Sequence, residues 1–93
     1  MNKYAPMRKV YSAVNAAEAR FAETGRKGSA YEGFREARAS VIWAERADET
    51  IEILPVFYAL KRKATEYRDA RKRNAAEALD MAASAVLRFA EEK

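Results

Sequence analysis

Residues 61–73 read KRKATEYRDARKR, and the way this stretch folds decides how many helices the chain contains. Apolar and small residues spaced three or four apart lie before it and after it, from Phe57 to Phe89. At 100° per residue both groups fall on the same helical face, so the phase of the pattern is kept across the basic stretch. The pattern therefore favours one long helix over residues 56–91.

A second architecture competes with this one. Asn74, followed by Glu77 three residues later, matches the N-cap of a new helix. The alternative is therefore a four-helix bundle that breaks near Arg71–Asn74. No glycine or proline marks such a break, so the preferred prediction is three helices with a long C-terminal one.

Glycine and proline divide the rest of the chain. Pro6 fits the first position of a helix over residues 6–24, which Gly25 ends. Ser29 with Glu32 matches a capping box that opens a second helix over residues 30–54. This helix is expected to stop before Pro55, because proline disfavours helical backbone in the residue ahead of it. The predicted core faces of these two helices contain Met7, Val10, Val14, Ala17 and Phe21, and Ala30, Phe34, Ala37, Val41, Ala44, Asp48 and Ile51.

The composition agrees with a small antiparallel helical bundle. The 93 residues include 21 alanines but only three glycines and two prolines, and alanine is the strongest helix former. We predict one all-α domain over residues 1–93, with helices that approach closely around a thin core.

The chain contains no cysteine and no histidine. This composition excludes disulfides, cysteine and histidine zinc sites, and triads with an imidazole base. Carboxylates gather in residues 45–52, but no second motif completes a metal or acid–base site. We therefore expect a protein that is not an enzyme, with no catalytic residues, no metal and no cofactor. Without a long apolar run or a secretory signal, the expected location is cytoplasmic, with no membrane partner.

Charge alternates along the chain. The net charge is +4 over residues 1–29, −3 over 30–56, +5 over 57–73 and −2 over 74–93. In an antiparallel bundle each helix would then face neighbours of opposite sign. The preferred interpretation of the basic stretch is a solvated face whose charges are matched on other helices.

The alternative interpretation is a binding surface. On a helical wheel Lys61, Arg68 and Lys72 form a ridge beside the apolar face, and Arg26 and Lys27 could join it. Such residues would contact phosphates of nucleic acid or another anion, with an affinity that falls steeply with salt. No aromatic stacking platform accompanies the ridge.

Two charged residues, Asp48 and Arg71, interrupt predicted apolar faces. If the chain reverses near residue 55, helix geometry keeps the two apart. We expect Lys61 or Lys63 to pair with Asp48, and Glu36 to pair with Arg71.

Trp43 points away from the predicted core face of the second helix, on the side of Leu54. The preferred expectation is that Trp43 packs on the first helix or on the last segment. The alternative is that Trp43 and Leu54 belong to a partner or homodimer surface, where tryptophan is a common hot spot.

In size, helicity and lack of catalytic residues the chain is similar to small phage and mobile-element proteins that inhibit a larger host complex. The all-α anti-CRISPR proteins are one such class. No motif carries this similarity, and it transfers no residue roles. We predict a non-enzymatic inhibitor or regulator that binds a larger protein or nucleoprotein complex through Trp43, Leu54, Lys61, Arg68 and Lys72. Nucleic-acid binding is the second hypothesis, and a self-associating structural subunit is the third.

Overall fold

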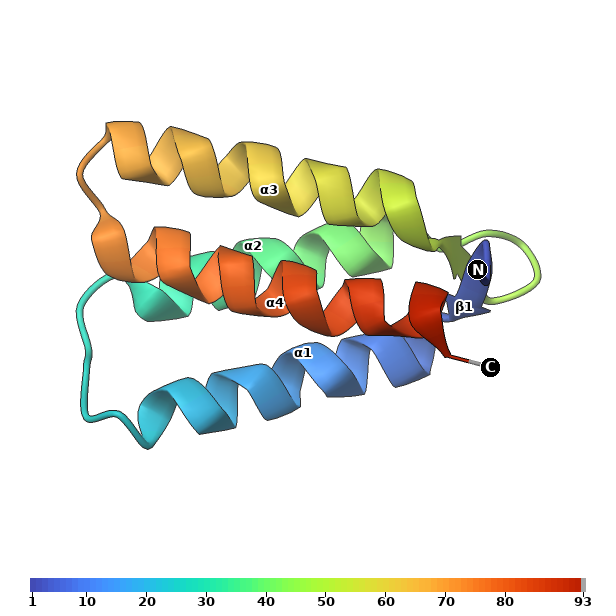
Figure 1. Ribbon diagram of the computed structural model, residues 1–93, viewed down its shortest axis with the longest axis horizontal. Helices are drawn as coiled ribbons and strands as arrows, with labels where there is room; N and C mark the ends of the chain where they lie inside the picture. The colour runs from blue at the N-terminus through green and yellow to red at the C-terminus, as the bar shows by residue number, and fades with distance from the viewer. Residues whose placement is uncertain (93) are drawn as a thin grey trace.

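The computed structural model describes residues 1–92, which form four helices and one short antiparallel ribbon (Figure 1). The elements in chain order are β1 (Tyr4–Pro6), α1 (Met7–Ala22), α2 (Ala30–Trp43), β2 (Thr50–Glu52), α3 (Ile53–Asp69) and α4 (Arg73–Glu91). The prediction of a small all-α bundle is confirmed, and the four-helix alternative is the architecture observed.

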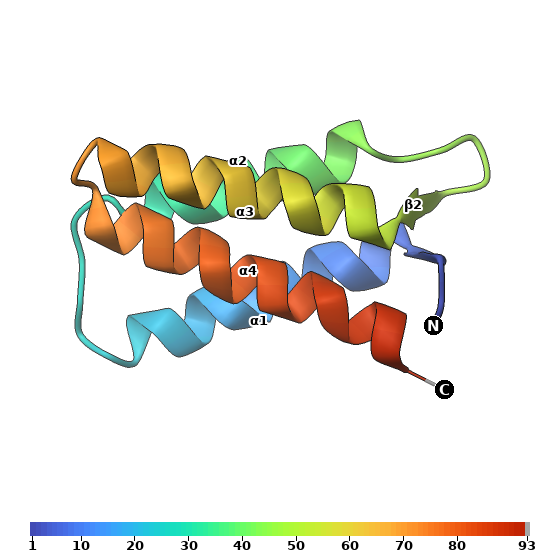
Figure 2. The same ribbon diagram turned by 45° about the horizontal axis from the view of Figure 1, so that its top comes forward.

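The helices run side by side along the 36 Å long axis of the molecule, so the bundle has two distinct ends (Figures 1 and 2). One end holds β1, β2, the segment 44–49 and residues 1 and 92, and is called the strand end below. The other holds the α1–α2 loop, residues 23–29, and the α3–α4 turn, residues 70–72, and is called the turn end.

α4 lies at the centre of the bundle and packs against α1, α2 and α3 (Figure 1). Its buried side chains are Ala75, Ala76, Ala78, Leu79, Ala82, Ala83, Ala85, Val86 and Ala90. Seven of these nine are alanines, so three neighbouring helices can approach α4 closely. The thin alanine-rich core expected from the composition is present.

Gly33 of α2 lies very close to the backbone of α4. A Cβ atom built on Gly33 would lie 2.4 Å from the carbonyl oxygen of Ala75 and 2.8 Å from the Cβ atom of Ala78, both on α4. Real Cβ atoms do not come within 3.0 Å of such atoms. Glycine is therefore required at residue 33 by the separation of the two helices.

The chain turns sharply between α3 and α4, so the preferred long helix over residues 56–91 is wrong. Arg71 adopts a left-handed conformation with φ 63°. The N–H of Lys72 donates to the carbonyl of Tyr67 at 2.8 Å, and that of Arg71 to the carbonyl of Arg68 at 3.0 Å. These two bonds are the pair that defines a Schellman C-cap. An arginine takes the position that glycine usually occupies, which is why the sequence carries no visible break.

The second helix ends eleven residues earlier than predicted, at Trp43 rather than Leu54. The intervening residues form an exposed segment and then β2, in which Ile51 pairs with Ala5 of β1. Pro55 does not end a helix but lies in the first turn of α3, where no backbone N–H is needed. The ribbon links the starts of α1 and α3, since the N–H of Ile53 donates to the carbonyl of Lys3 at 3.0 Å.

Candidate functional site

The basic ridge predicted from residues 61–73 is matched by carboxylates on other helices. Asp80 of α4 accepts from the Nζ atom of Lys61 at 2.8 Å and from a guanidinium nitrogen of Arg68 at 2.6 Å. Lys72 lies 3.1 Å from a carboxylate oxygen of Glu32 on α2. These pairs agree with the interpretation of charge complementarity between segments. Lys61, Arg68 and Lys72 do not form a ridge free of acidic neighbours.

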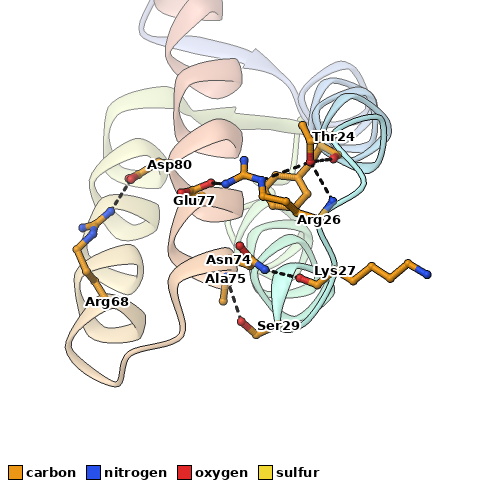
Figure 3. Close-up of polar contacts among 10 residues, drawn as sticks. Thr24, Arg26, Lys27, Ser29, Arg68, Asn74, Ala75, Glu77 and Asp80 are labelled. Carbon is orange, nitrogen blue, oxygen red and sulfur yellow. Dashed lines mark hydrogen bonds and ion pairs between the residues drawn. The ribbon is translucent and has the colours of Figure 1, made fainter.

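The α1–α2 loop is joined to α4 by contacts that local sequence patterns did not reveal (Figure 3). Arg26 forms an ion pair with Glu77, and the side-chain amide of Asn74 donates to the carbonyl of Lys27. The hydroxyl oxygen of Ser29 accepts from the N–H of Ala75 at 3.2 Å. The side chain of Lys27 points away from these contacts (Figure 3).

Two predicted helix caps are therefore wrong. Ser29 makes no side-chain cap to its own helix, because its hydroxyl satisfies an N–H of α4, and Glu32 is paired with Lys72. Asn74 is not an N-cap either, since α4 begins at Arg73 and the side chain of Asn74 binds the loop.

The partners predicted for the two interrupting charges are also wrong. Glu36 pairs with Lys63 at 3.3 Å, and Arg71 lies in the exposed turn rather than on an apolar face. Asp48 lies in the exposed segment 44–49, where Thr50 donates its hydroxyl at 2.7 Å. Arg46, and not a lysine of α3, is the cation near Asp48, at 3.9 Å.

Trp43 does not pack on the first helix or on the last segment. It ends α2 with 87% of its surface exposed, and its neighbour Ile42 is 50% exposed. The preferred expectation for Trp43 is thus wrong, while the alternative of an exposed surface agrees with the geometry. Leu54 is exposed in the first turn of α3, and Tyr58 is exposed one turn further.

Most exposed large apolar side chains of residues 1–92 gather at the strand end. They are Met1, Tyr4, Ile42, Trp43, Leu54 and Tyr58, whereas Tyr31 lies near the turn end. Beside Ile42, a shallow hollow of about 400 Å³ is lined by Met7, Arg8, Tyr11 and Ser12 of α1. Sequence reasoning found Trp43 and Leu54 but missed the other four.

The segment next to Trp43 is acidic. Residues 44–52 contain four carboxylates and one arginine, a net charge of −3. The hydrogen bond from the Thr50 side chain, with a smaller contribution from Arg46, lowers the pKa of Asp48 below its usual value. This carboxylate therefore stays ionised at neutral and mildly acidic pH.

A different surface lies at the turn end. A hollow of about 530 Å³ is lined by Arg68, Arg71, Arg73 and Glu77, where α3 meets α4. Arg71 and Arg73 were absent from the residues predicted for anion contact. The four-helix alternative could have identified Arg71 and Arg73, because a turn after Asp69 places residues 71–73 at an exposed corner instead of on a helix face.

The described residues 1–92 contain no group of three or more carboxylates that could hold a metal ion. Over the same range, each helix is either too short or too polar to cross a membrane. Comparisons with protein-family models, with curated proteins and with solved structures found no match.

Proposed function

We propose that the protein is a non-enzymatic interaction protein that inhibits or regulates a larger protein or nucleoprotein complex by docking its strand end on a protein surface. The exposure of Trp43, with Ile42 beside it, carries this proposal. Because this side chain lies outside the core, its burial contributes little to the stability of the bundle. Trp43 is also the only tryptophan of the chain.

The free energy gained by burying Trp43 indicates how large an interface the partner needs. Burying about 200 Å² of indole is worth about 5 kcal/mol. Association itself costs about 4–15 kcal/mol, so Trp43 needs help from neighbouring apolar side chains. The bundle measures 25 × 21 Å across its end, so the flat area of this end is about 500 Å² before the relief of the side chains is added. A stable interface buries about 800 Å² on each partner. A partner must therefore cover most of the strand end.

The charge around Trp43 defines the chemistry of the partner. The segment that follows Trp43, residues 44–52, carries a net charge of −3, so we expect a complementary surface to have an apolar pocket with a basic rim. Such a rim would accelerate association and fix the orientation of the complex.

Photo-crosslinking tests the proposal whatever the identity of the partner. A photoreactive amino acid placed at residue 43 should give a discrete crosslinked protein in cells, while the same group at Tyr31 should not. Tyr31 is a matched control because it is 59% exposed but lies near the turn end. No crosslink specific to residue 43 would refute the proposal. A product of twice the 10.5 kDa chain mass would show that a second copy occupies the surface instead.

Affinity for the captured protein provides the quantitative test. Trp43→Ala should weaken binding by about 30-fold or more, which corresponds to a hot spot of about 2 kcal/mol. The free energy of unfolding should change by less than about 0.5 kcal/mol, as for other exposed positions. Equal affinities of the variant and the parent protein would contradict the assigned role of Trp43.

A further inference from the structure

The hollow at the turn end is lined by three arginines and one glutamate, and it is open to solvent. Arg68 reaches it from the last turn of α3, Arg71 from the turn itself, and Arg73 from the first residue of α4. The Schellman turn holds these three residues within six positions of chain around a single corner. The side chains come from rigid elements and from a turn closed by two backbone hydrogen bonds.

Two carboxylates at or near this hollow, Glu77 and Asp80, already have cationic partners. Glu77 is bound by Arg26, and Asp80 is shared by Lys61 and Arg68. Among residues 1–92, no carboxylate lies within ion-pair distance of Arg71 or Arg73. Both guanidinium groups therefore face the hollow without a counter-ion supplied by the fold.

Arg68 can also serve a ligand in the hollow. Its one ion pair uses a single guanidinium nitrogen, and a guanidinium carries five N–H donors. Lys61 contacts the other oxygen of Asp80, so this carboxylate keeps a cation even if Arg68 turns toward a ligand.

Two of these arginines occupy positions that the fold alone does not favour. Arg71 is held at φ 63°, where a side chain costs about 1 kcal/mol relative to glycine. Arg73 is the first residue of α4, where the helix dipole disfavours a positive charge, and no acidic residue lies in that first turn. An anion in the hollow would relieve both charges.

We propose that Arg68, Arg71 and Arg73 form a phosphate-binding site, and that its ligand is the phosphate backbone of nucleic acid. Guanidinium groups match phosphate oxygens with paired hydrogen bonds. The hollow is lined by no aromatic side chain on which a base could stack, so the site contacts the backbone rather than the bases. Lys27 and Lys72 lie at the same end of the bundle, where a continuing chain of phosphates would pass. This site is separate from the strand end, and the proposal does not depend on the proposed function.

Three arginines set the strength of the salt dependence. Three phosphate contacts on duplex DNA give a slope of about −2.7 in log K against log salt, or about a 40-fold loss between about 50 and about 200 mM. Removing two of the three should reduce this loss to about 3.5-fold.

The test measures binding of the full chain to a short fluorescent DNA duplex at those two salt concentrations. The test variant is Arg71→Gly/Arg73→Gln. It should fold at least as well as the parent protein, because glycine suits the left-handed turn and glutamine removes a charge that the dipole disfavours. The charge-matched control is Lys9→Gln/Arg62→Gln, which changes two exposed residues outside the hollow.

The proposal expects the parent protein and the control to bind with similar slopes, and the test variant to lose most of the affinity and of the slope. Equal losses in the control and the test variant would show non-specific attraction to net charge and would overturn the site. Absence of duplex binding at about 50 mM salt would also overturn it. Inorganic pyrophosphate is the last probe, and its binding in the hollow is followed by NMR shifts at residues 71–74. If pyrophosphate binds there while duplex binding is absent, the ligand is a small phosphate and not nucleic acid.

Discussion

Replacement of Gly33 by alanine tests the packing of the bundle most directly. In a helix exposed to solvent this change would stabilise the protein by about 1 kcal/mol, because alanine is the better helix former. In α2 the new methyl group would lie 2.4 Å from the carbonyl oxygen of Ala75. Ordinary contact begins at 3.4 Å, so α2 and α4 would have to separate locally by about 1 Å.

The obstacle is backbone, so no side-chain rotation relieves it. Overpacking a core costs about 1–3 kcal/mol, and a backbone clash belongs at the upper end of this range. After the gain in helix propensity is subtracted, Gly33→Ala should lower the free energy of unfolding by about 2 kcal/mol. The melting temperature of a domain of this size should fall by about 8–16 °C.

Urea unfolding followed by far-ultraviolet circular dichroism gives the required free energies. Ala16→Gly, at an exposed position of α1, measures the propensity contribution alone. Adding Ala78→Gly to Gly33→Ala should give no rescue, because it removes the neighbour at 2.8 Å but leaves the carbonyl oxygen of Ala75. If Gly33→Ala is as stable as the parent protein, or more stable, the close approach of α2 and α4 is refuted.

Three further outcomes are expected. Ser29→Ala should lower the free energy of unfolding by about 1 kcal/mol in urea unfolding, as loss of a helix cap does, because the N–H of Ala75 loses its acceptor; an unchanged stability would contradict this role. Arg71→Gly should raise the free energy of unfolding by about 0.5–1 kcal/mol, and with it the melting temperature. Arg71→Val should lower both, because a β-branched residue is disfavoured at positive φ. The pKa of Asp48 is lower in the folded chain, so its contribution to stability is present above the unfolded pKa and is lost as pH falls through the folded pKa. A carboxyl NMR titration of Asp48 should give a midpoint below that of an unfolded peptide, and Thr50→Ala should raise the midpoint.

Helical periodicity predicted most of the buried side chains of α1 and α2. Val10, Val14 and Phe21 on α1 and Phe34 and Val41 on α2 are all buried, as their spacing indicated. The same periodicity gave the wrong architecture after residue 56. The three residues of the α3–α4 turn happen to keep the apolar faces of both helices in phase, so the pattern could not distinguish a turn from a continuous helix.

The remaining errors arise where a residue acts on a distant part of the chain. Ser29 has the right neighbours for a local cap, but its hydroxyl binds an N–H that lies 46 positions away. The strands contain three residues each and depend on one another, so no strand pattern was long enough to detect. Trp43 is exposed because α2 ends at this residue. The helix predicted from the sequence extended to Leu54, and this exposure was therefore not predicted.

The candidate surfaces were only partly predicted, because the predicted ends of the helices were misplaced. Trp43 was identified because of its residue type, which is unusual away from an apolar face. Arg71 and Arg73 were not, because assigning residues 56–91 to one helix distributed their charges around its circumference. Only the turn brings their guanidinium groups to the hollow beside Arg68.

The contacts of Asn2 have a practical consequence for experiments. Its backbone N–H donates to the carbonyl of Ala90 at 2.8 Å, and its side chain donates to the carbonyls of Phe89 and Glu92. Residues 2 and 92 are thereby held together at the strand end, so an affinity tag or fluorescent fusion at either residue would obstruct the proposed docking face. A circular permutant, with these ends joined by a short linker and the chain opened at the exposed Gly25, would move the fusion point to the far end of the 36 Å bundle. Such a permutant would leave the strand end free for interaction screens.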